Sequence, residues 1–193
     1  MEDYVWYFVY GSNIMKERFL CYITGDPFKW RSCDGGNGCT NKDLPHDSRE
    51  HKINYTLYFA QSAPCWDNKG VAFISSKETS GHEIWGRVWK ITKDQFEQIW
   101  KQEGRGPEWY PKRIELGQME GIPIWTITSG EEENKTNPSK KYIKTIMCGL
   151  EETYKGKNEG TESEICNYLS KKEGIKNKYG LDELIQLFNT NEP

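Results

Sequence analysis

The chain has 193 residues and a formal net charge of −3, and 35% of its residues are hydrophobic and 13% aromatic. This length allows one domain with a full core, or one domain with a helical appendage. Lysines are interspersed with glutamates, which indicates a solvated surface and no nucleic-acid partner. No stretch reaches the roughly 18 apolar residues of a membrane span, so we expect no membrane partner.

The first apolar run, residues 4–10, predicts a buried and central strand. No basic segment precedes this run, so it is a poor signal peptide, and we expect a cytoplasmic protein. In that compartment the six cysteines are expected to remain reduced thiols. The sequence leaves open whether the chain forms a homodimer.

Gly11-Ser12-Asn13 breaks the first strand, and residues 14–24 then predict a helix that Gly25 and Pro27 end. Residues 25–52 are polar and rich in glycine and turn residues, which indicates a long loop. Loops of this length are usually functional or mobile. We therefore expect this loop to border the binding pocket and to set the choice of substrate.

Three further strands are predicted over residues 53–61, 70–75 and 83–91. Residues 92–95 form a capping box that begins a helix, and Gly104 is placed to end it. This helix is therefore expected between the strand over 83–91 and the strands that follow it.

A hairpin follows, with strands over 112–116 and 122–128. Beyond a charged loop the pattern becomes helical: Pro138 suits a first helical position, a second capping box occupies 161–164, and a short helix is expected over 181–188.

Together these elements predict an α+β fold, a small mixed β-barrel with inserted helices and a helical C-terminal tail. We expect one domain over residues 1–155 and a helical extension over 156–193 that packs on it.

The turn at Gly11-Ser12-Asn13 joins a buried strand to a helix, where backbone N–H groups favour a carboxylate or an oxyanion. Glycine lets the backbone approach a ligand closely. The alternative is that Ser12 or Asn13 only caps the helix.

Glu103 follows Phe96, Ile99 and Trp100 at spacings of seven, four and three, which places it near their apolar face of the helix. A carboxylate beside aromatic surface has a raised pKa, as a proton shuttle near neutral pH requires. The alternative is an ordinary surface glutamate at a helix end.

These two sites occur together in a known family. Residues 7–14 resemble the FxYGSNL signature of γ-glutamylcyclotransferases, and residues 83–91 followed by the helix ending at Glu103 resemble their second signature. Tyr110 matches a tyrosine of the family, and Tyr142 resembles the family's tyrosine on the helix after the barrel.

This resemblance covers residues 4–155 and implies a γ-glutamylcyclotransferase-type enzyme with a small-molecule γ-glutamyl substrate, and without a metal or a cofactor. It implies Glu103 as the general acid/base. It also implies the substrate-binding residues Tyr10, Gly11, Ser12, Asn13, Ile14, Tyr110 and Tyr142. In the implied reaction Glu103 takes a proton from the α-ammonium, the amine attacks its own γ-carbonyl, and 5-oxoproline and a free amine result.

Residues 18–23 and 58–73 resemble a bacterial subgroup related to the cyclotransferase that removes a γ-glutamyl protecting group in aminoglycoside synthesis. The chain departs from the family at Trp125, which stands where some members have a tyrosine near the substrate, and in the length of the 25–52 loop. Both departures are expected to change the pocket walls, so the sequence leaves the leaving amine open.

Other interpretations compete with this one. A non-catalytic module could use the same pocket to bind a small metabolite, although such a module does not need Glu103. A zinc-stabilised interaction protein, or a Cys33–Cys39 disulfide, is a further alternative. The residues that could hold zinc are Cys33, Cys39, His46, His51 and Cys65.

Overall fold

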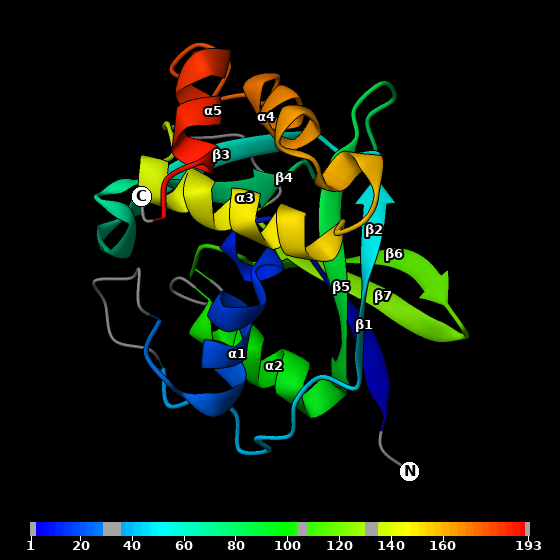
Figure 1. The fold of residues 1–193 in the computed structure, drawn as a ribbon. Coiled ribbons are helices and arrows are strands. Elements are labelled where there is room, and N and C mark those ends of the chain that lie inside the picture. The colour runs from blue at the N-terminus through cyan, green and yellow to red at the C-terminus, as the bar shows by residue number, and fades with distance from the viewer. Residues whose placement is uncertain (1–2, 29–35, 104–107, 130–134, 192–193) are drawn as a thin grey trace.

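The computed structural model describes residues 3–28, 36–103, 108–129 and 135–191 (Figure 1). Its helices and strands are, in chain order, β1 (Tyr4–Val9), η1 (Ser12–Ile14), α1 (Lys16–Thr24), β2 (Asp47–Ile53), β3 (Leu57–Ala63), η2 (Pro64–Trp66), β4 (Lys69–Ile74), β5 (Ile84–Thr92), α2 (Lys93–Gln102), β6 (Lys112–Met119), β7 (Ile122–Thr128), α3 (Lys140–Thr153), η4 (Asn158–Gly160), α4 (Glu162–Ser170) and α5 (Leu181–Phe188).

A five-stranded sheet with the order β2-β5-β1-β7-β6 forms the centre of the fold. Strand β1 pairs antiparallel with β5 and parallel with β7, which confirms the predicted central strand. Val5, Trp6 and Phe8 are fully buried. A strand that is covered on both faces needs apolar residues at successive positions, which is why residues 4–10 do not alternate with polar ones.

Strands β3 and β4 form a separate two-stranded sheet, and no closed barrel is found among the described strands. The α+β class is confirmed. The two sheets meet through a side chain: Thr128 Oγ1 on β7 accepts a hydrogen bond from Ile74 N (3.1 Å) and donates one to Ile74 O (2.6 Å) on β4. The hydroxyl thus satisfies both polar backbone groups of one β4 residue.

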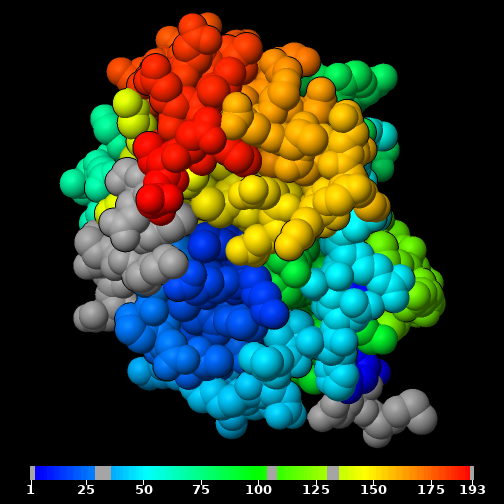
Figure 2. All heavy atoms as spheres, viewed as in Figure 1, coloured from blue at the N-terminus to red at the C-terminus, as the bar shows by residue number. Residues whose placement is uncertain are grey.

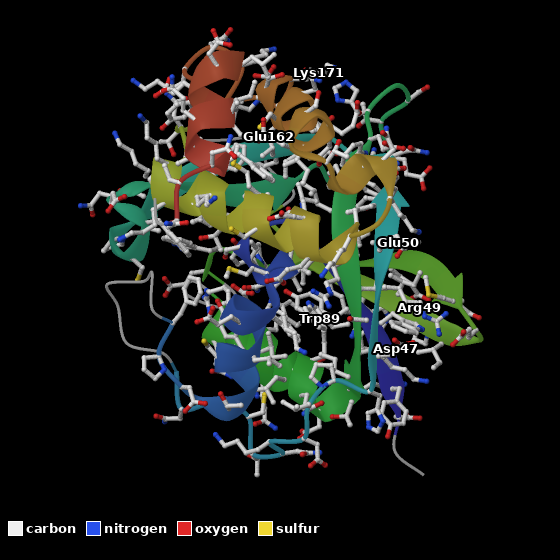
Figure 3. All side chains as sticks on the ribbon, in the orientation of Figure 1. Asp47, Arg49, Glu50, Trp89, Glu162 and Lys171 are labelled. Atoms are coloured by element: carbon white, nitrogen blue, oxygen red, sulfur yellow. The ribbon has the colours of Figure 1, made fainter. Side chains whose placement is uncertain are left out.

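Two sequence predictions in this region are wrong. The predicted loop over 25–52 ends earlier than expected, because Asp47–Ile53 is strand β2, and the predicted strand over 53–61 is replaced by the end of β2 and by β3. Strand β2 lies at the edge of the sheet, where β5 is its one partner among the described strands. Its sequence is polar and partly exposed, so it lacks the apolar run by which strands are recognised. Figure 3 shows Asp47, Arg49 and Glu50 along this strand.

Two other local signals placed their elements correctly. Helix α2 begins with the predicted capping box, in which Thr92 and Gln95 bond reciprocally. The β6–β7 hairpin is confirmed, and its turn residues Glu120 and Gly121 both have positive φ.

The predicted start of α3 is wrong. Pro138 is not its first residue, because Ser139 is the N-cap and accepts a hydrogen bond from Tyr142 N.

The predicted helical C-terminal region is confirmed, since the described chain after β7 forms α3, α4 and α5. These three helices contact one another. Figure 2 shows α4 and α5, in orange and red, covering one side of α3 in yellow. Tyr168 on α4 stacks on Trp85 of β5 at 4.4 Å and accepts a hydrogen bond from Trp85 N. No helix in the described part of the chain is long and apolar enough to cross a membrane.

The Thr128 bridge leads to a prediction about stability. Replacing Thr128 with Val keeps the shape but leaves Ile74 N and O without this partner, at about 1–3 kcal/mol for each buried group left unpaired. We expect the free energy of unfolding in urea to fall by at least that amount. The matched control is Thr126→Val, which removes a single donated bond to Phe8 O. Equal losses in the two variants would contradict the bridging role.

Candidate active site

Strand β1 leads directly into the turn that the sequence singled out. Ser12, Asn13 and Ile14 form one buried turn of 3₁₀ helix, and α1 begins only at Lys16 with Met15 as its N-cap. Neither Ser12 nor Asn13 caps α1, so the capping alternative is wrong. Gly11 is required by close packing, because a Cβ there would lie 2.6 Å from Tyr142 Oη.

Glu103 lies at the C-cap of α2, where its N–H bonds to Ile99 O and Trp100 O. Its exposed fraction is 9%, so the alternative of a surface glutamate is wrong. Asn13 Nδ2 donates a short hydrogen bond to Oε1, and Tyr22 Oη donates to Oε2 at 2.9 Å. Two donors from different elements therefore hold the two carboxylate oxygens.

A small cavity of about 40 Å³ lies beside the turn and Glu103. Seven of the predicted site residues line it: Tyr10, Gly11, Ser12, Asn13, Glu103, Tyr110 and Tyr142. Ile14 does not line it. Its side chain is fully buried and faces α3, where a Cβ on Gly149 would lie 2.9 Å from Ile14 Cβ.

The tyrosine hydroxyls of this cavity are tied to the backbone around it. Tyr110 Oη donates to Ala72 O (3.3 Å), and Tyr142 Oη accepts from Ala72 N (3.1 Å). Tyr10 Oη donates to Ile127 O at 2.6 Å. Trp100 on α2 holds Tyr110 in turn, because its Nε1 donates to Tyr110 O at 2.7 Å. The cavity walls are therefore fixed by β4, β7 and α2 together.

Burial keeps these tyrosines neutral. It raises the pKa of Tyr10 and Tyr110 well above the ordinary value, and it raises the pKa of Tyr142 to about 12. The pKa of Tyr7, which also lines the cavity, is raised well above the ordinary value by burial and, second, by the charge of Glu103. These phenols can serve as hydrogen-bonding groups at neutral pH, but not as bases.

Asn13 Oδ1 is buried and has no hydrogen-bond partner among the residues that the structure describes. The orientation of this amide follows from chemistry, because an ionised carboxylate only accepts and Asn13 must therefore present Nδ2 to Glu103. Since Asn13 lines the small cavity, its free oxygen is an acceptor for a ligand N–H.

A second cavity of about 190 Å³ adjoins the first and shares Ser12, Glu103, Tyr110 and Tyr142 with it. Its remaining wall is largely aromatic and apolar. It includes Tyr22, Val71, Trp66, Trp109 and the buried Arg18. Glu103 thus lies where a small polar cavity meets a larger and less polar one.

Sequence reasoning missed Tyr22, Arg18 and Ala72. The signal for the first two was their spacing of four on a predicted helix, but this spacing does not reveal what the face contacts. Trp125 was wrongly placed at the pocket. It packs against Phe96 at 5.3 Å and under Arg113 at 4.2 Å, and it does not line either cavity.

In the loop after α1, Phe28 lies beside two residues that line the second cavity, 6.4 Å from Trp66 and 5.8 Å from the Arg18 guanidinium. Residues 36–46 contribute no lining residue to either cavity. Residues 29–35, with Cys33, lie outside the described residues. The role of this loop in substrate choice stays a prediction.

The cysteines differ from the sequence prediction. Cys65 is disulfide-bonded, whereas Cys21, Cys39, Cys148 and Cys166 are free thiols. The Cys33–Cys39 alternative is therefore wrong. Among the described residues no group of three or more His, Cys, Asp or Glu side chains could hold a metal ion.

The raised pKa values predict how stability depends on pH. A phenol whose pKa is raised in the folded state contributes fully below its unfolded pKa of about 10, and this contribution is lost as the pH rises through the folded pKa. We expect the free energy of unfolding of the parent to fall steeply between about pH 10 and pH 12. Tyr142→Phe should fall less steeply in urea titrations over this range, and identical slopes would contradict the assignment.

No protein-family model matches the chain. Histone deacetylase 5 from Arabidopsis thaliana is 28% identical over 208 aligned positions, which cover 86% of this chain but 31% of that protein. The chain thus spans about a third of the length of this relative. The γ-glutamylcyclotransferase of Bos taurus is 28% identical over 149 positions, which cover 76% of this chain and 70% of the bovine protein.

The fold is similar to that of a solved γ-glutamylcyclotransferase, with a TM-score of 0.57 and 23% identity over 80% of this chain and 82% of the other. The likeness in fold and the likeness in sequence extend over most of the chain, and they agree with the two sequence signatures that meet at Glu103. In sequence and in fold, this chain is similar to γ-glutamylcyclotransferases over most of its length.

Proposed function

We propose that this chain is an enzyme that cyclises a γ-glutamyl amine to 5-oxoproline and releases the free amine, with Glu103 as the general acid/base. The observation that carries the proposal is the buried Glu103 carboxylate, which Asn13 holds at the junction of the two cavities. The activity of the bovine relative, as its name gives it, supports the same reaction class.

The small cavity is the proposed site of the glutamyl group. Its lining combines neutral tyrosine hydroxyls with the polar turn at Ser12 and Asn13, which suits a group carrying a carboxylate and an ammonium. The free Asn13 Oδ1 would accept an N–H from the substrate α-ammonium beside Glu103. This contact would place the nitrogen within reach of the base.

The reaction then needs one proton acceptor. Glu103, as carboxylate, takes a proton from the α-ammonium, and the freed amine attacks the γ-carbonyl carbon. The tetrahedral intermediate collapses when protonated Glu103 gives its proton to the departing nitrogen, so the C–N bond to the leaving amine breaks. Because the nucleophile belongs to the substrate, the protein contributes orientation and proton transfer.

The larger cavity is the proposed site of the leaving amine, since it shares Glu103 with the small one. Residues 1–155 are the proposed catalytic domain, because every described residue that lines the two cavities falls within them. Residues 156–193 are proposed to support it, since α4 and α5 pack on the helix that carries Tyr142. The predicted barrel would correspond to the two sheets that Thr128 joins.

Glu103→Gln tests this proposal. The substitution keeps size and polarity but removes the proton shuttle, so 5-oxoproline release should fall by about 10²–10⁴-fold. Substrates for the assay are found by screening γ-glutamyl dipeptides and γ-glutamyl polyamines with the parent chain. Substrate binding should survive, because the turn and not Glu103 is proposed to hold the α-carboxylate.

The matched control is Glu97→Gln, which changes a partly exposed glutamate of the same helix, outside both cavities, and should leave the rate unchanged. Equal rates for Glu103→Gln and the parent on one substrate would end the proposed role of Glu103. The non-catalytic binding module would then be the better interpretation.

A further inference from the structure

We propose that Tyr22 and Arg18 form a hydrogen-bonded arm that positions the Glu103 carboxylate and keeps it ionised. The proposal rests on the proposed function, in which Glu103 moves a proton. Neither residue belongs to the two signatures that gave the other site residues.

The arm is continuous and buried. Arg18 Nη2 donates to Tyr22 Oη at 2.5 Å, and Tyr22 Oη donates to Glu103 Oε2 at 2.9 Å. Arg18 and Tyr22 are 2% and 4% exposed. They lie four residues apart on α1 and therefore share one face of the helix. Helix α2 holds the arm as well, because Gln102 Nε2 donates to Tyr22 O at 3.1 Å.

The direction of the two hydrogen bonds is fixed by chemistry. A guanidinium only donates, so Tyr22 Oη accepts from Arg18, and the hydroxyl proton is left to point at Glu103. Hydrogen bonds in such a chain strengthen one another. Arg18 also makes no ion pair with any carboxylate in the described part of the chain, so its positive charge acts on Glu103 through Tyr22.

An interposed tyrosine suits a base better than a direct ion pair. A bidentate arginine would hold both carboxylate oxygens and would lower the pKa of the carboxyl strongly, which weakens it as a base. Tyr22 holds only Oε2 and Asn13 holds Oε1. One donor on each oxygen thereby fixes the plane of the carboxylate.

The other titratable groups around the site do not mimic this effect. Apart from Arg18 and Tyr22, the titratable side chains among the described residues that line the two cavities with Glu103 are Tyr7, Tyr10, Tyr110 and Tyr142. Burial raises the pKa of all four. They stay neutral at pH values below about 9, so a change in activity with pH in that range does not arise from them.

The test compares kcat/KM over pH for the parent and Tyr22→Phe on one γ-glutamyl substrate. Loss of the donor disfavours the charged form of Glu103, so the acidic limb should move to higher pH by roughly one to two units. At pH values below the parent's apparent pKa the rate should fall by roughly 10–100-fold, and at alkaline pH the two proteins should converge. A merely structural defect would lower the rate by the same factor at every pH.

Variants of Arg18 separate the arm from the cavity wall. Arg18→Met should move the limb in the same direction as Tyr22→Phe, and the double variant should move it no further than Tyr22→Phe alone, because Arg18 acts through Tyr22. Arg18→Lys keeps a cation and should therefore move the acidic limb less than Arg18→Met does. Additive shifts in the double variant would contradict the arm. The matched control is Tyr168→Phe, which removes a buried tyrosine hydroxyl that lines neither cavity and should not move the limb.

A second readout needs no activity. Infrared titration of the protein without substrate follows the Glu103 carboxyl directly, and Glu103→Gln identifies its band. The Glu103 band should titrate at higher pH in Tyr22→Phe than in the parent. If the parent releases 5-oxoproline but neither the limb nor the band moves, the arm is wrong and the proposed function stands. If the parent releases none, the proposed function is wrong, and the band still decides whether the arm holds Glu103.

Discussion

The burial of the Glu103 carboxylate is the constraint on which the arrangement of the site depends. An ionised carboxylate costs several kcal/mol when it leaves water, unless donors surround it. The turn after β1 provides Asn13, and α1 provides Tyr22. The capping box at Thr92 fixes where α2 begins, and the length of that helix sets where its last turn ends. The turn, the helix that follows it and the distant α2 thus converge on one charged group that has to be satisfied. In Figure 3, Trp89 lies between β5 and α1, and its Nε1 holds the turn by donating to Asn13 O at 3.1 Å.

A second constraint is the edge of β4 that faces away from β3. Backbone groups at a buried strand edge need partners, and here side chains supply them in place of a further strand. Tyr110 and Tyr142 bond to Ala72, and Thr128 bonds to Ile74. The same two tyrosines line the cavity beside Glu103. Side-chain hydroxyls, and not a further strand, connect this edge to Tyr110, to β7 and to α3. The backbones on either side of these side chains are therefore separated by the space that the cavity occupies. A continuous ladder would have closed that space.

The sequence predicts the parts of this molecule whose signals are local. The apolar run of β1, the capping box of α2 and the hairpin turn at Gly121 each depend on a few neighbouring residues, and each was placed correctly. Strand β2 was missed because a half-exposed edge strand carries no apolar pattern. Tyr22 was missed because its role depends on how α1 packs against α2, which helix periodicity does not specify. The resemblance that brought Glu103 and the turn together also misplaced Trp125, since a matching position on a strand does not fix which face the side chain occupies.

The position of Glu103 between two cavities has a consequence for the proposed reaction. The nitrogen that attacks and the nitrogen that leaves are bonded to the same carbon in the tetrahedral intermediate, so they are never more than a short distance apart. One carboxylate at the junction can therefore accept the first proton and deliver it to the second nitrogen without moving. Such a carboxylate must be a base before the attack and an acid after it, which requires a pKa that is neither very low nor very high. Burial disfavours the charged form of a carboxylate in general, whereas donors such as those of Asn13 and Tyr22 favour it. The opposing effects of a dry site and two hydrogen bonds would allow one side chain to serve both steps.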